Sequence, residues 1–141
     1  MANYFTIQEL CKSSTAIKNK IDNTPNATVR AHLNELIKFL NPLREAWGSA
    51  IMVSSGYRCK EVNTLVWGVP SSVHMIGYAA DIYPKNGKMS EFKKFIKNYL
   101  KDKKFDQCII EKNARNSEWI HLGLKNNSGM QRRQIFNMVV K

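Results

Sequence analysis

Histidine and aspartate side chains with the spacing of metal ligands are the first chemical feature of this 141-residue sequence. His74 and Asp81 lie seven positions apart, with Gly77 between them, and His121 follows much later in the chain. A catalytic zinc site takes three protein ligands, often histidine and carboxylate, and leaves a fourth position for water. His74, Asp81 and His121 are therefore candidate zinc ligands. The spacing by itself is a modest indication, because a histidine, an aspartate and a distant histidine also co-occur by chance.

Two predicted strands and a loop would position these ligands. The segment 68–77 is rich in Gly, Pro and Ser and predicts a loop that carries His74, while 78–83 predicts a short strand ended by Pro84. A second strand is predicted over 119–124, and it would hold His121 rigidly. The third histidine, His32, lies inside a helical pattern, and we interpret it as an ordinary surface or half-buried helix residue.

The rest of the chain predicts short helices and strands. In chain order they are a helix opened by the capping box Thr6–Glu9, a turn or two over 14–20, a helix from Ala27 that Pro42 kinks or ends, a strand over 50–53, a turn over 54–56, a helix over 58–66, a helix capped by Ser90 and running to about 101, and strands over 107–111 and 134–140. The links are too short for several parallel crossovers.

These elements favour an α+β fold, with a small, mainly antiparallel sheet, flanking helices and the zinc site in a cleft over the sheet. The length fits one domain over 1–141, with a helical part over about 1–48 and an α+β part over about 49–141. We expect a monomer.

Composition excludes several classes of protein. Hydrophobic residues make up 43% and charged residues 23%, as in globular proteins, and no apolar run is long enough to cross a membrane. The start of the chain lacks a basic region followed by an apolar one, so we expect no signal peptide. Three cysteines without a CxxC pair (Cys11, Cys59 and Cys108) favour free thiols in a reducing compartment.

The net charge of +11 is concentrated in the second part of the chain. Residues 1–81 hold eight basic against six acidic side chains, and residues 82–141 hold fourteen against five. Seven lysines account for much of the excess: Lys88, Lys93, Lys94, Lys97, Lys101, Lys103 and Lys104. Such a field favours a polyanionic partner, although a solvated helix face that aids solubility explains it as well.

Three motifs, in this order, resemble the zinc D-alanyl-D-alanine carboxypeptidase family. Ser55-Gly56-Tyr57-Arg58 matches its S-G-Y-R segment, with Asn63 following where the family often has Asn. The segment Ser72–Asp81 matches S-x-H-x-x-G-x-A-x-D at every fixed position, and Glu118–His121 matches E-x-x-H with Trp after the Glu. The N-terminal part is similar to short phage-type members, so the resemblance covers about 4–123. The same superfamily includes domains similar to those of hedgehog signalling proteins.

The resemblance implies a role for each matching residue. His74, Asp81 and His121 would bind one Zn²⁺ per chain. Glu118 would be the general base that takes a proton from the attacking water, and Arg58 would polarise the scissile carbonyl, hold the oxyanion and bind substrate. The remaining match, Ser72, would help to place the substrate.

Two local features complicate this assignment. Glu118 and His121 are three positions apart, so on a regular strand they would face opposite sides, and Glu118 would have to precede the strand or lie at a bulge. Where the family often has paired glycines, this chain has Trp67-Gly68-Val69-Pro70, which would alter the rim of the site and its substrate preference. The chain also carries Cys59 beside Arg58, and we interpret it as a small helix residue rather than as a nucleophile.

The function that the resemblance implies is hydrolysis of D-amino-acid-containing peptide bonds in the stem peptides of bacterial peptidoglycan. A phage endolysin or virion-associated lysin would be made in the cytoplasm of the infected cell and released to the wall, an endolysin by a holin. Carboxypeptidase, dipeptidase and endopeptidase activities would all use these ligands.

Two alternatives remain from the sequence. One is a non-catalytic zinc domain that serves as a phage structural or wall-binding piece; the presence of Glu118 argues for catalysis instead. The other is nucleic-acid binding through the lysine cluster. The aromatic residues near those lysines, Phe92, Phe95 and Tyr99, have helical spacing and predict a core face rather than a stacking platform, so we expect no nucleic-acid partner.

Overall fold

A computed structural model describes residues 3–140 of the chain. Met1, Ala2 and Lys141 lie outside this range. The expectation of no signal peptide therefore concerns a segment whose first two residues are not among those described. The elements are α1 (Ile7–Cys11), α2 (Ser14–Lys18), α3 (Ala27–Trp47), β1 (Ile51–Ser55), α4 (Lys60–Leu65), η1 (Val73–Ile76), β2 (Ala79–Pro84), α5 (Met89–Tyr99), η2 (Leu100–Asp102), β3 (Gln107–Lys112), β4 (Glu118–Gly123) and β5 (Gln134–Val139). Among the described residues, no helix is both long and apolar enough to cross a membrane.

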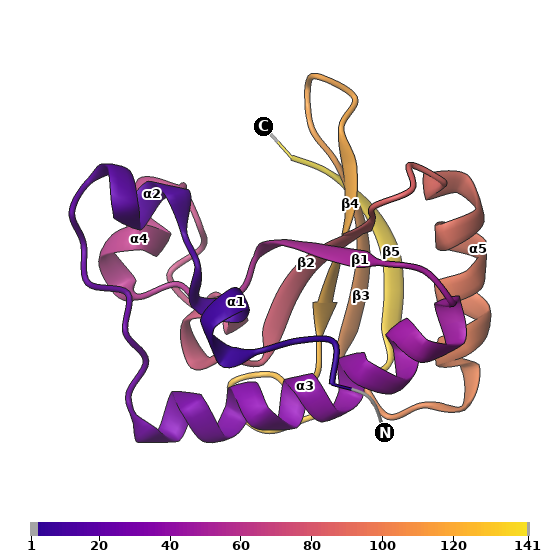
Figure 1. The fold of residues 1–141 in the computed structure, drawn as a ribbon, viewed down its shortest axis with the longest axis horizontal. Helices are drawn as coiled ribbons and strands as arrows, with labels where there is room; N and C mark the ends of the chain where they lie inside the picture. The colour runs from indigo at the N-terminus through magenta and orange to yellow at the C-terminus, as the bar shows by residue number, and fades with distance from the viewer. Residues whose placement is uncertain (1–2, 141) are drawn as a thin grey trace.

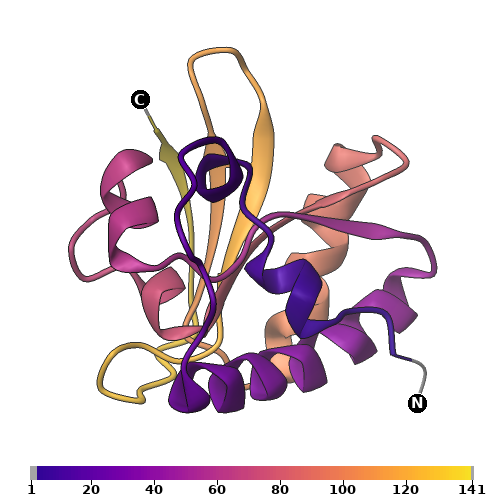
Figure 2. The same cartoon turned by 60° about the vertical axis from the view of Figure 1, so that its left-hand side comes forward.

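The five strands form one open sheet in the order β1-β2-β4-β3-β5. Three of the four pairings are antiparallel, and only β3 and β5 run parallel. The sheet stands between two groups of helices, with α5 on one side, α4 and α2 on the other, and α3 along one end (Figures 1 and 2). The predicted α+β class with a mainly antiparallel sheet is confirmed.

The long helix α3 passes through Pro42 without ending there. Its capping residue Asn26 accepts a hydrogen bond from the backbone of Val29, and the helix ends at Gly48, whose φ of 79° is left-handed. Of the two effects predicted for Pro42, a kink or an end of the helix, the end is therefore wrong. Burial of Leu40 and Leu43 on either side of the proline explains why the helix continues, because packing of its apolar face outweighs the lost backbone hydrogen bond.

Several predicted boundaries also shift. Strand β1 includes Ser54 and Ser55, which were predicted as a turn, and its pairing with β2 is irregular between Val53 and Ser55. Helix α5 begins at Met89 after Lys88 rather than after a Ser90 cap, and Asn86 accepts a hydrogen bond from the Lys88 backbone just before it. The helix predicted over 58–66 also begins later, at Lys60, so the candidate site residue Arg58 lies in the loop before α4.

The two faces of the sheet carry different kinds of side chain. One face packs against α5 and α3 and supplies the main core through buried residues such as Ala80, Ile82, Ile110, Ile120 and Leu122. Neighbours in the sheet present their side chains to the same face, so the alternate residues Asp81, Ile109 and His121 face the other way. We call this second surface the ligand face; it lies on the α4 side (Figure 1).

Candidate metal centre

Three side chains from separate elements converge on the ligand face. His74 comes from η1, Asp81 from β2 and His121 from β4, where Asp81 and His121 are directly paired. Asp81 Oδ1 lies 3.3 Å from His74 Nε2 and 3.2 Å from His121 Nδ1, and the two histidine nitrogens are 3.2 Å apart. The side chain of His74 is 2% exposed, and those of Asp81 and His121 are 14% exposed.

The chemistry and spacing of these donors fit a zinc ion. Tetrahedral zinc binds histidine nitrogen and carboxylate oxygen at roughly 2.0–2.2 Å, which places neighbouring ligand atoms roughly 3.3–3.5 Å apart. The three separations here are close to that range. Two neutral histidines and one aspartate leave a fourth position free for water. The group could therefore hold zinc in the manner of a catalytic site.

The loop between β1 and α4 fixes the ring of His74. Its Nδ1 lies 2.7 Å from the carbonyl oxygen of Gly56, to which it can donate, so that Nε2 is left as the ligand atom. The backbone N–H of Arg58 donates in turn to the carbonyl of His74 at 3.1 Å. A Cβ atom on Gly56 would lie 2.1 Å from the carbonyl oxygen of Leu10, so only glycine allows this loop to pack against the end of α1.

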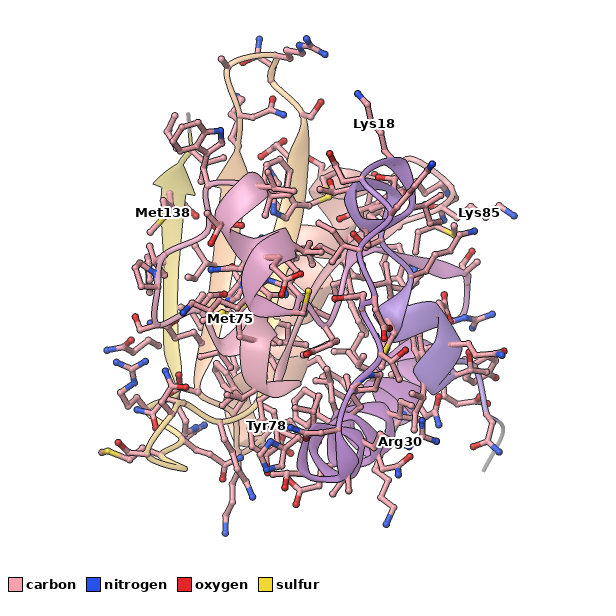
Figure 3. The ribbon with its side chains drawn as sticks, turned by 90° about the vertical axis from the view of Figure 1, so that its left-hand side faces the viewer. Lys18, Arg30, Met75, Tyr78, Lys85 and Met138 are labelled. Atoms are coloured by element: carbon pink, nitrogen blue, oxygen red, sulfur yellow. The ribbon has the colours of Figure 1, made fainter. Side chains whose placement is uncertain are left out.

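A second support comes from α3, below the turn that follows His74. Gly77 has a left-handed φ of 85°, and a Cβ there would meet the backbone of Val29. The half-buried His32 stacks on Tyr78 at 4.0 Å between ring centroids, and its Nδ1 lies 2.7 Å from the carbonyl oxygen of Ile76. Figure 3 shows Tyr78 close to α3 and Met75 above Tyr78 in the view. His32 thus supports the turn and is no part of the donor group.

Arg58 and Ser72 lie together beside His74. The Nη2 atom of Arg58 donates to Ser72 Oγ at 3.3 Å, and Ser72 Oγ also accepts from the backbone N–H of His74 at 3.2 Å. The Nε atom of Arg58 is buried and has no hydrogen-bond partner among the described residues. Arg58 is held with its positive charge close to Asp81, whereas the described contacts of Ser72 anchor the arginine and the start of η1.

The structure does not bring Glu118 to this group. Glu118 is the first residue of β4, paired in regular register with Lys112, and so faces the side of the sheet opposite to His121. Its carboxylate accepts from Lys93 Nζ of α5 at 2.9 Å. Neither of the two arrangements that the general-base role required, a place before the strand or a bulge, is present, so this geometry argues against that role.

A different carboxylate, Glu111 at the end of β3, occupies the ligand face. Its partner in the sheet is Trp119, and the next pair on the same face is Ile109 with His121. Trp119 Nε1 donates to Glu111 Oε1 at 2.7 Å, which leaves Oε2 available. Sequence reasoning placed Glu111 in a strand and gave it no role, because only the pairing register of β3 with β4 shows that it shares a face with His121.

One family profile, described as Peptidase M15, matches residues 3–123, which is most of the chain. The chain belongs to the Peptidase M15 family. This confirms the family resemblance that the three sequence motifs indicated. No curated protein matches the chain. Membership supports a zinc-dependent peptidase, and the group of His74, Asp81 and His121 is where the structure could hold the metal.

The electrostatics of this M15 site suit metal binding and proton transfer. Burial lowers the pKa of His74 despite the nearby Asp81 charge, which favours the neutral ring that a metal requires. Burial alone would raise the pKa of Asp81, but the two histidines outweigh it and keep the carboxylate ionised. The pKa of Glu111 is raised, first by burial and then by the charge of Asp81, against opposing effects of His121, Trp119 and Arg58.

The segment that departs from the motif of paired glycines is fastened to α4. Asn63 Nδ2 donates to the carbonyl of Val69 at 2.9 Å, and a Cβ on Gly68 would lie 2.0 Å from Asn63 Oδ1. Trp67 just before it has a left-handed φ of 61° and a side chain that is 94% exposed. The altered substrate preference expected from this segment stays a prediction.

Proposed function

We propose that this M15 protein is a zinc peptidase that hydrolyses D-amino-acid-containing peptide bonds in the stem peptides of bacterial peptidoglycan. The observation that carries the proposal is the convergence of His74, Asp81 and His121 on one face of the sheet, with ligand-atom separations of 3.2–3.3 Å. Arg58 lies beside this group, where it donates to Ser72, and Glu111 shares its face. D-Ala-D-Ala carboxypeptidase-type cleavage is the chemistry that the sequence motifs favour.

Each residue of the site has a separate role in the proposed reaction. His74 Nε2, Asp81 Oδ1 and His121 Nδ1 would hold zinc, which when bound lowers the pKa of water to about 7. Glu111 Oε2 accepts the proton of the attacking water, because Oε1 is engaged by Trp119, and passes it to the leaving amine. The positive charge of Arg58, close to Asp81, would stabilise the carbonyl oxygen as negative charge develops there.

Peptidoglycan as substrate and a phage lysin as biological context rest on two supports. The motifs resemble those of wall-directed D-alanyl-D-alanine carboxypeptidases, and the net charge of +11 suits an anionic wall. Synthesis in the cytoplasm of the infected cell, release by a holin, association with the virion and a monomeric state belong to the same proposal.

The test is digestion of purified peptidoglycan by the zinc-loaded protein, followed by mass spectrometry of the released muropeptides. We expect loss of terminal D-alanine or cleavage within the stem peptide, and no products from a matched H121A variant. The mass of each product identifies the bond that is cut. Intact stem peptides after incubation with zinc-loaded wild-type protein would contradict the proposal.

A non-catalytic zinc domain is the second candidate, and the position of Glu118 on the far side of the sheet favours it, because the motif then supplies no base at the metal. Under this alternative the protein would bind zinc and sediment with insoluble peptidoglycan without releasing any fragment. The same digestion separates the two functions.

A further inference from the structure

A groove on the face of the sheet opposite to the ligand face is not used by the proposed reaction. It has a volume of about 550 Å³ and lies between α5 and the ends of β3, β4 and β5. Figures 1 and 2 show α5 on the side of the sheet away from α4. The lining residues are Ser90, Lys93, Lys94, Lys97, Ile110, Lys112, Glu118, Asn137, Met138 and Val139. We call it the lysine groove.

The charge in the lysine groove is strongly positive. Four lysines line it, and Glu118 is the one carboxylate among the lining residues. That carboxylate is paired with Lys93 at 2.9 Å, so Lys94, Lys97 and Lys112 carry the excess positive charge. All three are exposed, which leaves their ammonium groups free to meet a ligand. On α5, Lys93, Lys94 and Lys97 lie within about a turn of helix, roughly 6 Å along its axis, and Lys112 joins them from the end of β3.

We propose that the lysine groove binds a linear anionic chain that carries phosphate groups in its backbone. Lysine binds phosphate as a point charge, and the lining residues include no arginine that would recognise a carboxylate by two parallel hydrogen bonds. Ile110 and Val139 give the groove an apolar side against which the carbon segments between phosphates can pack. The site is separate from the metal group, since the sheet lies between them.

A flexible phosphodiester chain without bases fits better than a nucleic acid. The aromatic side chains of α5 are turned to the core, where Phe92 and Phe95 lie 5.0 and 5.2 Å from Trp47 between ring centroids. None of them lines the groove, so the stacking platform that single-stranded nucleic acid uses is missing from it. Anchoring on a wall polymer of this kind would hold the peptidase close to its substrate.

Glu118 gains a role here in place of the one that the motif implied. Its ion pair with Lys93 removes one positive charge from the groove and fixes the start of β4 against α5. Neutralising Glu118 would release the Lys93 ammonium and so should strengthen anion binding. This effect has the opposite sign to the loss expected from a residue that merely maintains the fold.

Binding of inorganic polyphosphate, measured by isothermal titration with the full zinc-loaded chain over a range of salt, tests the proposal without any catalytic readout. We expect K94Q/K97Q/K112Q to bind at least tenfold more weakly at low salt. Its plot of log affinity against log salt should flatten by roughly 0.7 for each lost contact. The matched control K18Q/K38Q/K85Q removes three exposed lysines that do not line the groove. Equal losses in the two triple variants would overturn the proposal.

Two further arms keep the result specific. We expect E118Q to bind polyphosphate severalfold more tightly than wild type. E111Q, on the ligand face, should bind polyphosphate as tightly as wild type does. Weaker binding by E118Q with an intact circular dichroism spectrum would count against the groove. A single-stranded oligonucleotide that binds more tightly per phosphate than polyphosphate, with the same sensitivity to the groove triple, would replace the proposed occupant by nucleic acid. Peptidase activity does not enter either readout, so failure here leaves the proposed function untouched.

Discussion

At the scale of single residues, the three metal ligands could be predicted from the sequence, whereas the carboxylate beside them could not. The ligands His74, Asp81 and His121 were identified from residue type and motif, because each supplies a specific donor that few other residues can replace. The base was assigned to Glu118 by the motif, whereas strand geometry places that residue against Lys93 and places Glu111 beside Trp119. Glu118 and His121 are three positions apart, and they could share a face of the sheet only if the strand had a bulge or began after Glu118. The sequence does not show whether such a bulge is present.

The pair E111Q and E118Q tests this reassignment. Glutamine at 111 can still accept a hydrogen bond from Trp119 but cannot take a proton, so we expect turnover to fall on the order of 10²-fold or more with zinc retained. E118Q should keep near-normal turnover. The measurement is the steady-state rate on a D-amino-acid-containing muropeptide together with zinc content. Collapse of turnover in E118Q, with E111Q active, would restore the motif's assignment.

At the scale of elements, periodicity and capping gave most helices and strands. The strand segments around 107–111 and 119–124 were predicted within a residue or two of β3 and β4, because buried apolar residues and turn residues bound them. The continuation of α3 past Pro42 and the parallel pairing of β5 with β3 depend on tertiary packing. The buried Asp106 was also missed, because its role appears only when its partner, 26 positions later, is in place.

Asp106 joins the strand β5 to the rest of the sheet. Its carboxylate accepts from Arg132 Nε at 2.7 Å, from Nη2 at 2.8 Å and from the Arg132 backbone at 3.1 Å. Burial alone would raise the pKa of Asp106, but the hydrogen bonds and charge of Arg132 outweigh it and lower the pKa. This stabilisation is therefore present above the pKa of about 4 of an aspartate in an unfolded chain and is lost as the pH falls through the lower folded value.

We expect D106N to lower the free energy of unfolding by about 1–3 kcal/mol at pH 7, because charged hydrogen bonds to a buried carboxylate are replaced by weaker ones. The difference between variant and wild type should shrink as the pH is lowered below about 4. Urea unfolding of both proteins in the metal-free state, at pH 7 and pH 3.5, measures it. A difference that stays constant or grows on acidification would show that the ion pair is not its source.

At the scale of the whole molecule, the sheet separates two surfaces. Its ligand face carries the metal group, supported by α3 and by the loop after β1, and its other face carries the lysine groove beneath α5. The uneven charge along the sequence predicted a basic region, but only the folded chain shows which lysines share a groove and that Lys101 does not line it. The separation means that anion binding in the lysine groove and hydrolysis at the metal group should respond to different substitutions.

The central claim is that His74, Asp81 and His121 together hold the zinc. Elemental analysis of purified protein tests it directly, with H32N as the matched control, because asparagine can still bond to the Ile76 carbonyl. We predict about one zinc per chain in wild type and H32N, and a loss of most of the metal in H74A, D81A and H121A. Stoichiometric zinc in D81A or H121A, or loss of zinc in a folded H32N protein, would contradict the account.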